Sequence, residues 1–192
     1  MLTEIILTSI LSILLAIIIL LIRKRYFDFS KVKIQIKGYK ILIIMAVIEI
    51  TAQFLYKHFS DNNFLKFLSL SWLIYFAILY VTALNIKKSY MMLFFVGTLL
   101  NFIAIAANNF KMPVLVSEVL SDIETKKMYL LSGQDLIHSL LTTDTKFKLL
   151  CDIITIPPPY PFSKNISIGD VFLLSGIFAF WQDIFEGVKS KQ

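Results

Sequence analysis

The sequence predicts an all-α membrane protein of about five transmembrane helices, with a helical extracytoplasmic cap between the fourth and the fifth. Three observations support this prediction. Hydrophobic residues make up 57% of the 192 residues and charged residues only 17%, whereas soluble domains average about 45–50% and about 25%. The apolar residues form long runs, and most basic residues lie on one side of these runs. Residues 1–192 are therefore a single polytopic membrane domain, which excludes a soluble enzyme, a disordered chain and a disulfide-rich secreted module.

Four apolar runs in the first part of the chain are predicted to span the bilayer, because each approaches the roughly 20 residues that cross its hydrocarbon core. The first is not a cleavable signal peptide, since Glu4 precedes it and basic residues follow it. A short outer turn joins the second span to the third, and a short inner turn joins the third to the fourth. The predicted spans are residues 2–22, 41–59, 64–84 and 90–107.

Residues 108–167 form a polar excursion with six lysines and six acidic residues, and we expect a structured outer cap. Met112-Pro113-Val114 is predicted to open a short helix, because proline is tolerated in a first turn. A capping box from Ser132 to Asp135 predicts a second helix. Asp144 could cap a third, whose apolar residues recur at helical spacing. The cap is therefore predicted to be helical.

The last apolar run follows a stiff proline-rich stretch at residues 157–161. Ser167 and Asp170 form a second capping signature that opens it. Its strictly apolar part is short for a span, but residues 168–188 together are long enough. We predict a fifth span here, with a re-entrant or interfacial helix as the alternative.

The net charge of +6 comes from residues 23–40, which hold seven basic residues and one acidic residue. Because this block directly follows a span, it indicates a cytoplasmic segment that contacts anionic lipid headgroups, and not a nucleic-acid site. Eleven basic residues lie in the short inner segments and the C-terminus, against two in the short outer turn. This asymmetry predicts an N-terminus and a cap outside, and a C-terminus inside.

Glu49 lies in the middle of the second span, and Gln53 lies one turn further along the same face. Ionisable residues at this depth are candidates for function, such as a proton or cation site or an anchor for a polar ligand. The alternative is a protonated glutamate that hydrogen-bonds another helix. Asn101 is predicted at a similar depth, so Glu49 and Asn101 could pair as a midplane polar site.

Two stripes of small and polar residues predict close helix packing, because small side chains let helix backbones approach. The stripe on the fourth span consists of Gly97, Asn101, Ala104 and Asn108. The stripe on the first span consists of Thr8, Ser12 and Ala16. Both stripes repeat at helical spacing.

Several polar residues of the cap are expected to converge at the outer ends of the fourth and fifth spans, because the excursion must return to the membrane edge. They are Asn108, Met112-Pro113, His138, Thr145, Asp152 and Asp170. Such residues could bind a ligand, or they could cap helices and lock the loop. The candidate site residues are therefore Glu49, Gln53, Asn101, Asn108, His138, Asp152 and Asp170.

His138, Ser139, Cys151 and Asp152 also permit a nucleophilic hydrolase, but no nucleophile elbow and no recognisable cysteine motif occurs. Cys151 falls on the apolar face of its predicted helix, where cysteine acts as a small hydrophobe. The chain has no metal-ligand spacing, no P-loop and no dinucleotide fingerprint. We therefore predict no catalytic residue, no metal and no cofactor.

Four segments in order resemble a family of small bacterial polytopic membrane proteins that is classed as a domain of unknown function. The matching segments are residues 97–114, His138-Ser139, residues 145–152 and residues 167–170. Asn109 and Phe110 replace two glycines of that family, and Cys151 replaces another. The resemblance implies a bacterial cytoplasmic membrane location and this architecture, but no activity.

Three functions compete. The first is a non-enzymatic membrane component that binds a ligand or a partner through its cap, alone or as a homo-oligomer. The second is a small transporter or channel subunit that uses Glu49 and Asn101 at the midplane. The third, and least favoured, is a membrane hydrolase.

Overall fold

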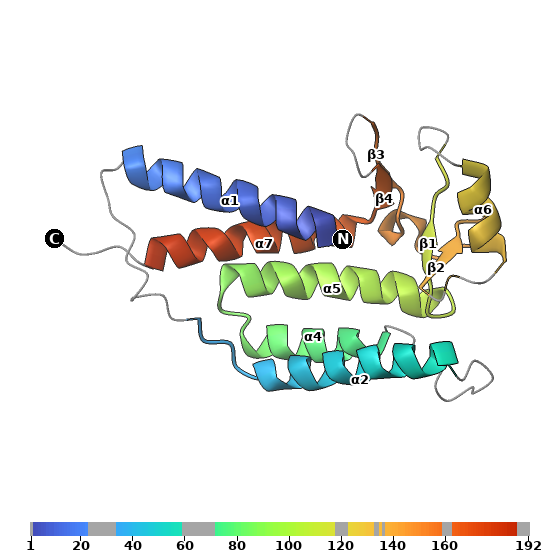
Figure 1. The fold of residues 1–192 in the computed structure, drawn as a ribbon, viewed down its shortest axis with the longest axis horizontal. Helices are drawn as coiled ribbons and strands as arrows, with labels where there is room; N and C mark the ends of the chain where they lie inside the picture. The colour runs from blue at the N-terminus through green and yellow to red at the C-terminus, as the bar shows by residue number, and fades with distance from the viewer. Residues whose placement is uncertain are drawn as a thin grey trace.

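A computed structural model describes residues 2–22, 34–58, 72–117, 123–132, 135, 137–158 and 163–187 (Figure 1). Within these ranges the chain forms six α-helices, one 3-10 helix and two small sheets. The helices are α1 (Leu2–Ile22), α2 (Tyr39–His58), α4 (Trp72–Leu84), α5 (Ser89–Ala107), α6 (Ile123–Leu131), η2 (Lys148–Leu150) and α7 (Ile168–Gly187). The strands are β1 (Met112–Val114), β2 (His138–Leu140), β3 (Ile154–Ile156) and β4 (Lys164–Ile166).

Five helices lie side by side in the order α2, α4, α5, α7, α1, and the cap lies at one end of this row (Figure 1). These helices leave many large apolar side chains exposed and bury small residues such as Ser12, Ala16, Ala52, Ala77 and Ala104. On α2, for example, Ala52 is buried while Ile44 and Val47 are exposed. Helices that are apolar all round are typical of membrane spans, because lipid tails cover the outward face.

Three helices among the described residues are long and apolar enough to cross a membrane: Ile5–Ile22, Ser89–Ala107 and Ile168–Phe185. The last apolar run is thus one continuous helix of span length. Five such helices are not found in this part of the chain. α4 has 13 residues, because the first part of the predicted third span lies outside the described residues. α2 has 20 residues but carries Glu49 in its middle and Lys57 near its end.

The predicted stripe on the first span lies against α7. Ser12 and Ala16 are buried, and the Ser12 hydroxyl donates to the Phe178 carbonyl at 2.9 Å. The Gln182 amide donates to the Ser12 carbonyl at 2.9 Å. Small residues therefore bring the two backbones close enough for side chains to bond backbone atoms of the facing helix.

The cap is not purely helical, which corrects the sequence-based expectation. The segment Met112–Val114 is strand β1 and pairs in parallel with β2, and β3 pairs antiparallel with β4. The helix expected after Asp144 is reduced to η2, because Phe147 adopts a left-handed φ of 51° that a helix cannot continue through. The described part of the Pro157–Pro161 stretch ends at residue 158.

The turn after α5 is left-handed at two residues, Asn109 with φ 56° and Phe110 with φ 58°. The Phe110 N–H donates to the Ile105 carbonyl at 3.0 Å, which closes the helix end. Glycine is the usual residue for this geometry, so the two glycines implied by the family resemblance fit the turn. Asparagine tolerates the left-handed region, whereas Phe110 is strained there.

Candidate ligand-binding site at the cap end of the helices

The first turn of α7 is closed by a reciprocal capping box, as the sequence predicted. The Asp170 N–H donates to the Ser167 hydroxyl at 2.9 Å, and the Ser167 N–H donates to Asp170 Oδ2 at 3.1 Å. Both side chains are buried. The box leaves Asp170 Oδ1 available to a neighbouring helix, because only one carboxylate oxygen is used in capping.

Asn101 of α5 completes this cluster. Its amide donates to Asp170 Oδ1 at 3.0 Å, and its carbonyl accepts the Ser167 hydroxyl at 2.7 Å. The helices approach closely here because Gly97 and Gly169 face each other; a Cβ on Gly97 would lie 2.6 Å from the Gly169 carbonyl oxygen. The predicted small-and-polar stripe therefore packs on α7. Asn101 thus bonds to the start of α7, and its pairing with Glu49 stays a prediction.

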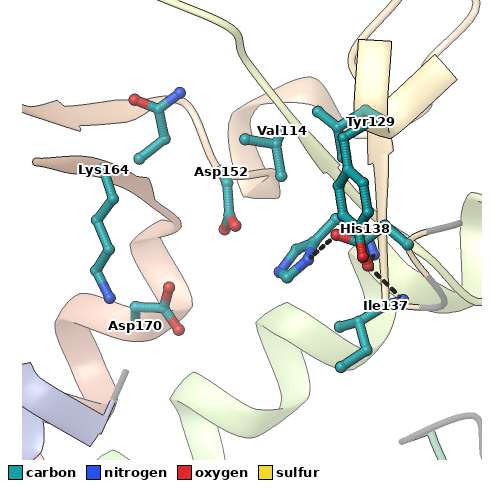
Figure 2. A pocket seen from close by; sticks show the side chains of 10 residues that line it. Val114, Tyr129, Ile137, His138, Asp152, Lys164 and Asp170 are labelled. Carbon is teal, nitrogen blue, oxygen red and sulfur yellow. Dashed lines mark hydrogen bonds and ion pairs between the residues drawn. The ribbon is translucent and has the colours of Figure 1, made fainter. Parts of the chain in front are cut away.

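A cavity of about 580 Å³ opens beside this cluster, between α7 and the sheets of the cap (Figure 2). Its lining comes from segments that are far apart in the sequence. The lining residues are Val114, Tyr129, Leu130, Asp135, Ile137, His138, Asp152, Lys164, Asn165 and Asp170. Three of the candidate residues from the sequence, His138, Asp152 and Asp170, thus line one cavity.

The backbone of Asp152 is held by β1. The Asp152 N–H donates to the Pro113 carbonyl at 3.0 Å, and the Asp152 carbonyl accepts the Leu115 N–H at 3.0 Å. These two bonds extend the sheet of β1 by one residue, in an isolated bridge between Val114 and Asp152. Figure 2 shows the Asp152 carboxyl group pointing into the cavity, between His138 and Asp170.

His138 and Asp135 form a side-chain pair at the cavity wall, with His138 Nδ1 3.0 Å from Asp135 Oδ2. Asp135 Oδ1 also accepts the N–H groups of Ile137 and His138, both at 2.8 Å. Burial opposes ionisation of Asp135, but these backbone hydrogen bonds and the His138 charge outweigh it and lower its pKa. Asp135 therefore serves as a turn-forming anion and not as the cap of the helix predicted from Ser132.

Asn165 and Lys164 enter the lining from β4. Asn165 is buried, and its amide donates to the Leu115 carbonyl. Within the described ranges its Oδ1 is buried without a hydrogen-bond partner. Figure 2 shows the Lys164 side chain extending toward Asp170. The β4 strand thus adds one cation and one unsatisfied acceptor to a wall of carboxyl groups.

The lining carries three aspartates and one lysine, so its formal charge is −2 when His138 is neutral. The aspartates come from three separate segments, and Asp152 and Asp170 are both mostly buried. Charged groups in a partly closed site interact more strongly than in bulk water. The cavity therefore favours a ligand with a positive charge.

The other candidates lie away from the cavity lining. Glu49 is half-buried on α2, and the side chain of Gln53 lies outside the described residues. Asn108 caps α5 and clamps the backbone of Lys146, with both bonds at 2.9 Å. Burial and the Asp152 charge raise the pKa of the Cys151 thiol to about 11, so it is a poor nucleophile at neutral pH.

Three lining residues with a charged or amide side chain, Asp135, Lys164 and Asn165, were not among the candidates from the sequence. Asp135 was interpreted as part of a capping box, and its side-chain pairing with His138 three residues on could have been proposed from spacing alone. Lys164 and Asn165 gave no signal, because their place depends on the pairing of β3 with β4. No group of three or more His, Cys, Asp or Glu with metal-binding geometry occurs among the described residues.

Comparison with known families finds a match over most of the chain. A family model described as a family of unknown function, DUF5317, matches residues 33–182. That region contains α2, α4, α5, the whole cap and most of α7. Comparison with curated proteins and with solved structures gives no match.

Proposed function

The chain belongs to DUF5317, a family of unknown function, and we propose that it is a non-enzymatic membrane protein whose cap binds a small ligand with a positively charged amino group. The observation that supports this proposal is the convergence of Asp135, Asp152 and Asp170 on one cavity. The cavity volume of about 580 Å³ falls within the roughly 300–1,000 Å³ of small-molecule sites.

The chemistry of the lining suits an organic cation. An ammonium group donates hydrogen bonds to carboxylates and to amide oxygens, so Asp152 and Asn165 Oδ1 are suitable acceptors. The apolar residues Val114, Leu130 and Ile137 offer contact area for the carbon skeleton. The Tyr129 ring adds a face that attracts cations. A bare metal ion suits this lining less well, because metals require several oxygen ligands at fixed short distances.

We further propose that the row of helices crosses the bilayer five times, in a bacterial cytoplasmic membrane, with the cap outside. α2 and α4 pack in the same row as the three helices of span length, which supports their crossing too (Figure 1). Lys37 and Lys88 lie at the end opposite the cap, where Lys88 Nζ donates to the Gln35 carbonyl at 2.5 Å. Basic residues at one end favour placing that end inside, near anionic lipid headgroups.

This topology can be tested by cysteine labelling in a Cys151→Ala chain. An impermeant thiol reagent added to intact cells should label Lys127→Cys in the cap and leave Lys87→Cys unlabelled. Labelling of Lys87→Cys alone would reverse the orientation. Permeabilised cells provide the control, since both positions are exposed and should then react.

Ligand binding can be tested on the full chain in lipid nanodiscs with butylamine, 1,4-diaminobutane and butyrate as probes. The two amines should raise the unfolding temperature and butyrate should not. A ligand at 100 times its Kd raises the free energy of unfolding of the protein by about 2.7 kcal/mol. Calorimetry then gives the affinity of the better amine.

The matched variants are Asp152→Asn, which keeps the shape of the side chain, and Asp144→Asn, which removes an exposed acid elsewhere in the cap. We expect Asp152→Asn to lose most of the amine effect and Asp144→Asn to retain it. If no amine stabilises the protein, or if both variants respond alike, the cavity is not an amine site.

A further inference from the structure

Two short loops of the cap present large apolar side chains to the surroundings at the end of α5. Phe110, in the turn after α5, is 42% exposed. Phe147, just before η2, is 60% exposed, and Leu149, within η2, is 78% exposed. We call these three residues the apolar rim. Exposed apolar side chains that gather in one place are unusual on a cap surrounded by water.

The backbone holds the apolar rim in place at a conformational cost. Phe110 and Phe147 both have left-handed φ values, 58° and 51°, which disfavour residues with a Cβ by about 1–2 kcal/mol. The surrounding hydrogen bonds maintain this geometry, since the Leu150 N–H donates to the Phe147 carbonyl at 2.8 Å. The fold therefore keeps these rings outward instead of turning them into the core of the cap.

The apolar rim lies beside the end of α5, a helix long and apolar enough to cross a membrane. Asn108 is the C-cap of α5, and its amide clamps the Lys146 backbone with two bonds of 2.9 Å. η2 contacts both α5 and α7, which are two of the helices long enough to cross a membrane. Ile168 and Val171, at the start of α7, are also exposed apolar residues.

From this placement we infer that the apolar rim inserts into the interfacial region of the bilayer leaflet next to the cap. Segments that bind at membrane interfaces combine Phe or Leu side chains, which enter the boundary between headgroups and acyl chains, with lysines whose ammonium groups meet the headgroups. The exposed Lys146 and Lys148 flank Phe147 and supply these ammonium groups. The insertion anchors the floor of the cap to the lipid and does not depend on what the cavity binds.

The test uses single-cysteine chains in a Cys151→Ala background, reconstituted in phosphatidylcholine nanodiscs and labelled with the environment-sensitive fluorophore NBD. Leu149→Cys is the test position, because a side chain that is 78% exposed contributes little packing to the fold. Met128→Cys is the matched control, because Met128 is an apolar residue of the same cap that is 63% exposed on α6.

We expect NBD at position 149 to emit at shorter wavelength and to be quenched by lipids with a spin label near the headgroup. NBD at position 128 should be quenched by aqueous iodide instead. If iodide quenches both positions alike, the apolar rim faces water and the inference is wrong. If the blue shift at position 149 persists in detergent and disappears on dilution of the protein, a second copy covers the rim, which also overturns it.

Discussion

The two ends of the helix row are each held by one buried asparagine, but the two asparagines bind different kinds of atoms. At the cap end, Asn101 bonds the side chains of Ser167 and Asp170. At the opposite end, Asn85 bonds backbone only: its carbonyl accepts the Lys37 N–H at 3.0 Å, and its amide donates to the Lys37 and Val81 carbonyls. The same side chain thus links helices in two ways.

Asn85 is therefore a purely structural clamp, whereas Asn101 connects the helices to the cavity through Asp170. The bonds of Asn85 would survive any change of side chain at position 37, because they involve only main-chain atoms of Lys37. The bonds of Asn101 depend on Asp170, whose carboxyl group also lines the cavity. A change at the cap end should therefore affect stability and binding together, whereas a change at the other end should affect stability alone.

The largest difference in stability between the two ends is expected when a glycine at each end is replaced by alanine. In Gly169→Ala the new methyl group would overlap Asn101 Oδ1 and lie 2.7 Å from the Gly97 carbonyl oxygen, so we expect a loss of about 3 kcal/mol or more. Gly38→Ala meets its nearest side-chain atom at 3.3 Å but has a φ of +80°, so the loss should be about 1 kcal/mol. Unfolding by denaturant titration in detergent measures both. Equal losses would show that the tight contact at the cap end relaxes easily.

The asparagines themselves give the second prediction. Asn85→Ala leaves backbone groups of Lys37 without their partner and should cost about 1–3 kcal/mol. Asn101→Ala should cost at least as much, because it leaves Asp170 Oδ1 and the Ser167 hydroxyl, both in buried side chains, without their partner. Amine affinity should separate the two variants, falling in Asn101→Ala and not in Asn85→Ala.

A double-mutant cycle checks this distinction. Asn101→Ala combined with Asp170→Asn should show a coupling of about 0.5–3 kcal/mol, and Asn85→Ala combined with Asp170→Asn should be additive within about 0.5 kcal/mol. Coupling of Asn85 to Asp170 would mean that the two ends are not independent.

A third prediction has the opposite sign. Phe110→Gly removes the strain of a left-handed φ and should stabilise the detergent-solubilised protein by up to about 1 kcal/mol, after the added chain entropy is subtracted. Asn109→Gly should be nearly neutral, because asparagine already tolerates this region. The same unfolding titration measures the stability of both variants. Destabilisation by Phe110→Gly would show that contacts of the Phe110 ring stabilise the protein in detergent by more than the strain costs.

The smallest expected effect is a pH dependence confined to the cap end. The pKa of Asp135 is lowered from 3.8 in the folded chain, so its contribution to stability is present above that value and is lost as the pH falls through the lower folded pKa. Hydrogen exchange in residues 135–138 should therefore accelerate in acid. Asp135→Asn should reduce this acceleration, and Asp144→Asn should leave it unchanged. The Asn85 clamp is neutral and should show no such dependence.

Features that depend on local spacing were predictable from the sequence. The capping box at Ser167 and Asp170 and the close packing of Gly97 and Asn101 follow from residue types at helical intervals, and both occur in the structure. The three helices of span length follow from apolar content over about 20 residues. The DUF5317 match agrees with the resemblance in being a family of unknown function.

Features that depend on long-range pairing were not predictable. The strands β1 and β2 are three residues each and are joined across a distant part of the chain, so their local signal resembles a helix start or a loop. Phe147 gives no local sign of its left-handed backbone, which ends the helix expected after Asp144. Asn101 could not be assigned to Asp170, because depth along a helix does not reveal which neighbour its face meets.

The bond between Asn101 and Asp170 joins residues 69 positions apart, and this has a consequence during synthesis. At about 5–20 residues per second, roughly 3–14 s separate the appearance of the two residues. Throughout this interval a newly inserted α5 holds an asparagine whose partners have not been made. We expect a chain stopped at residue 166 to be degraded faster in the cell than the complete chain, and an added Asn101→Leu change to slow that degradation.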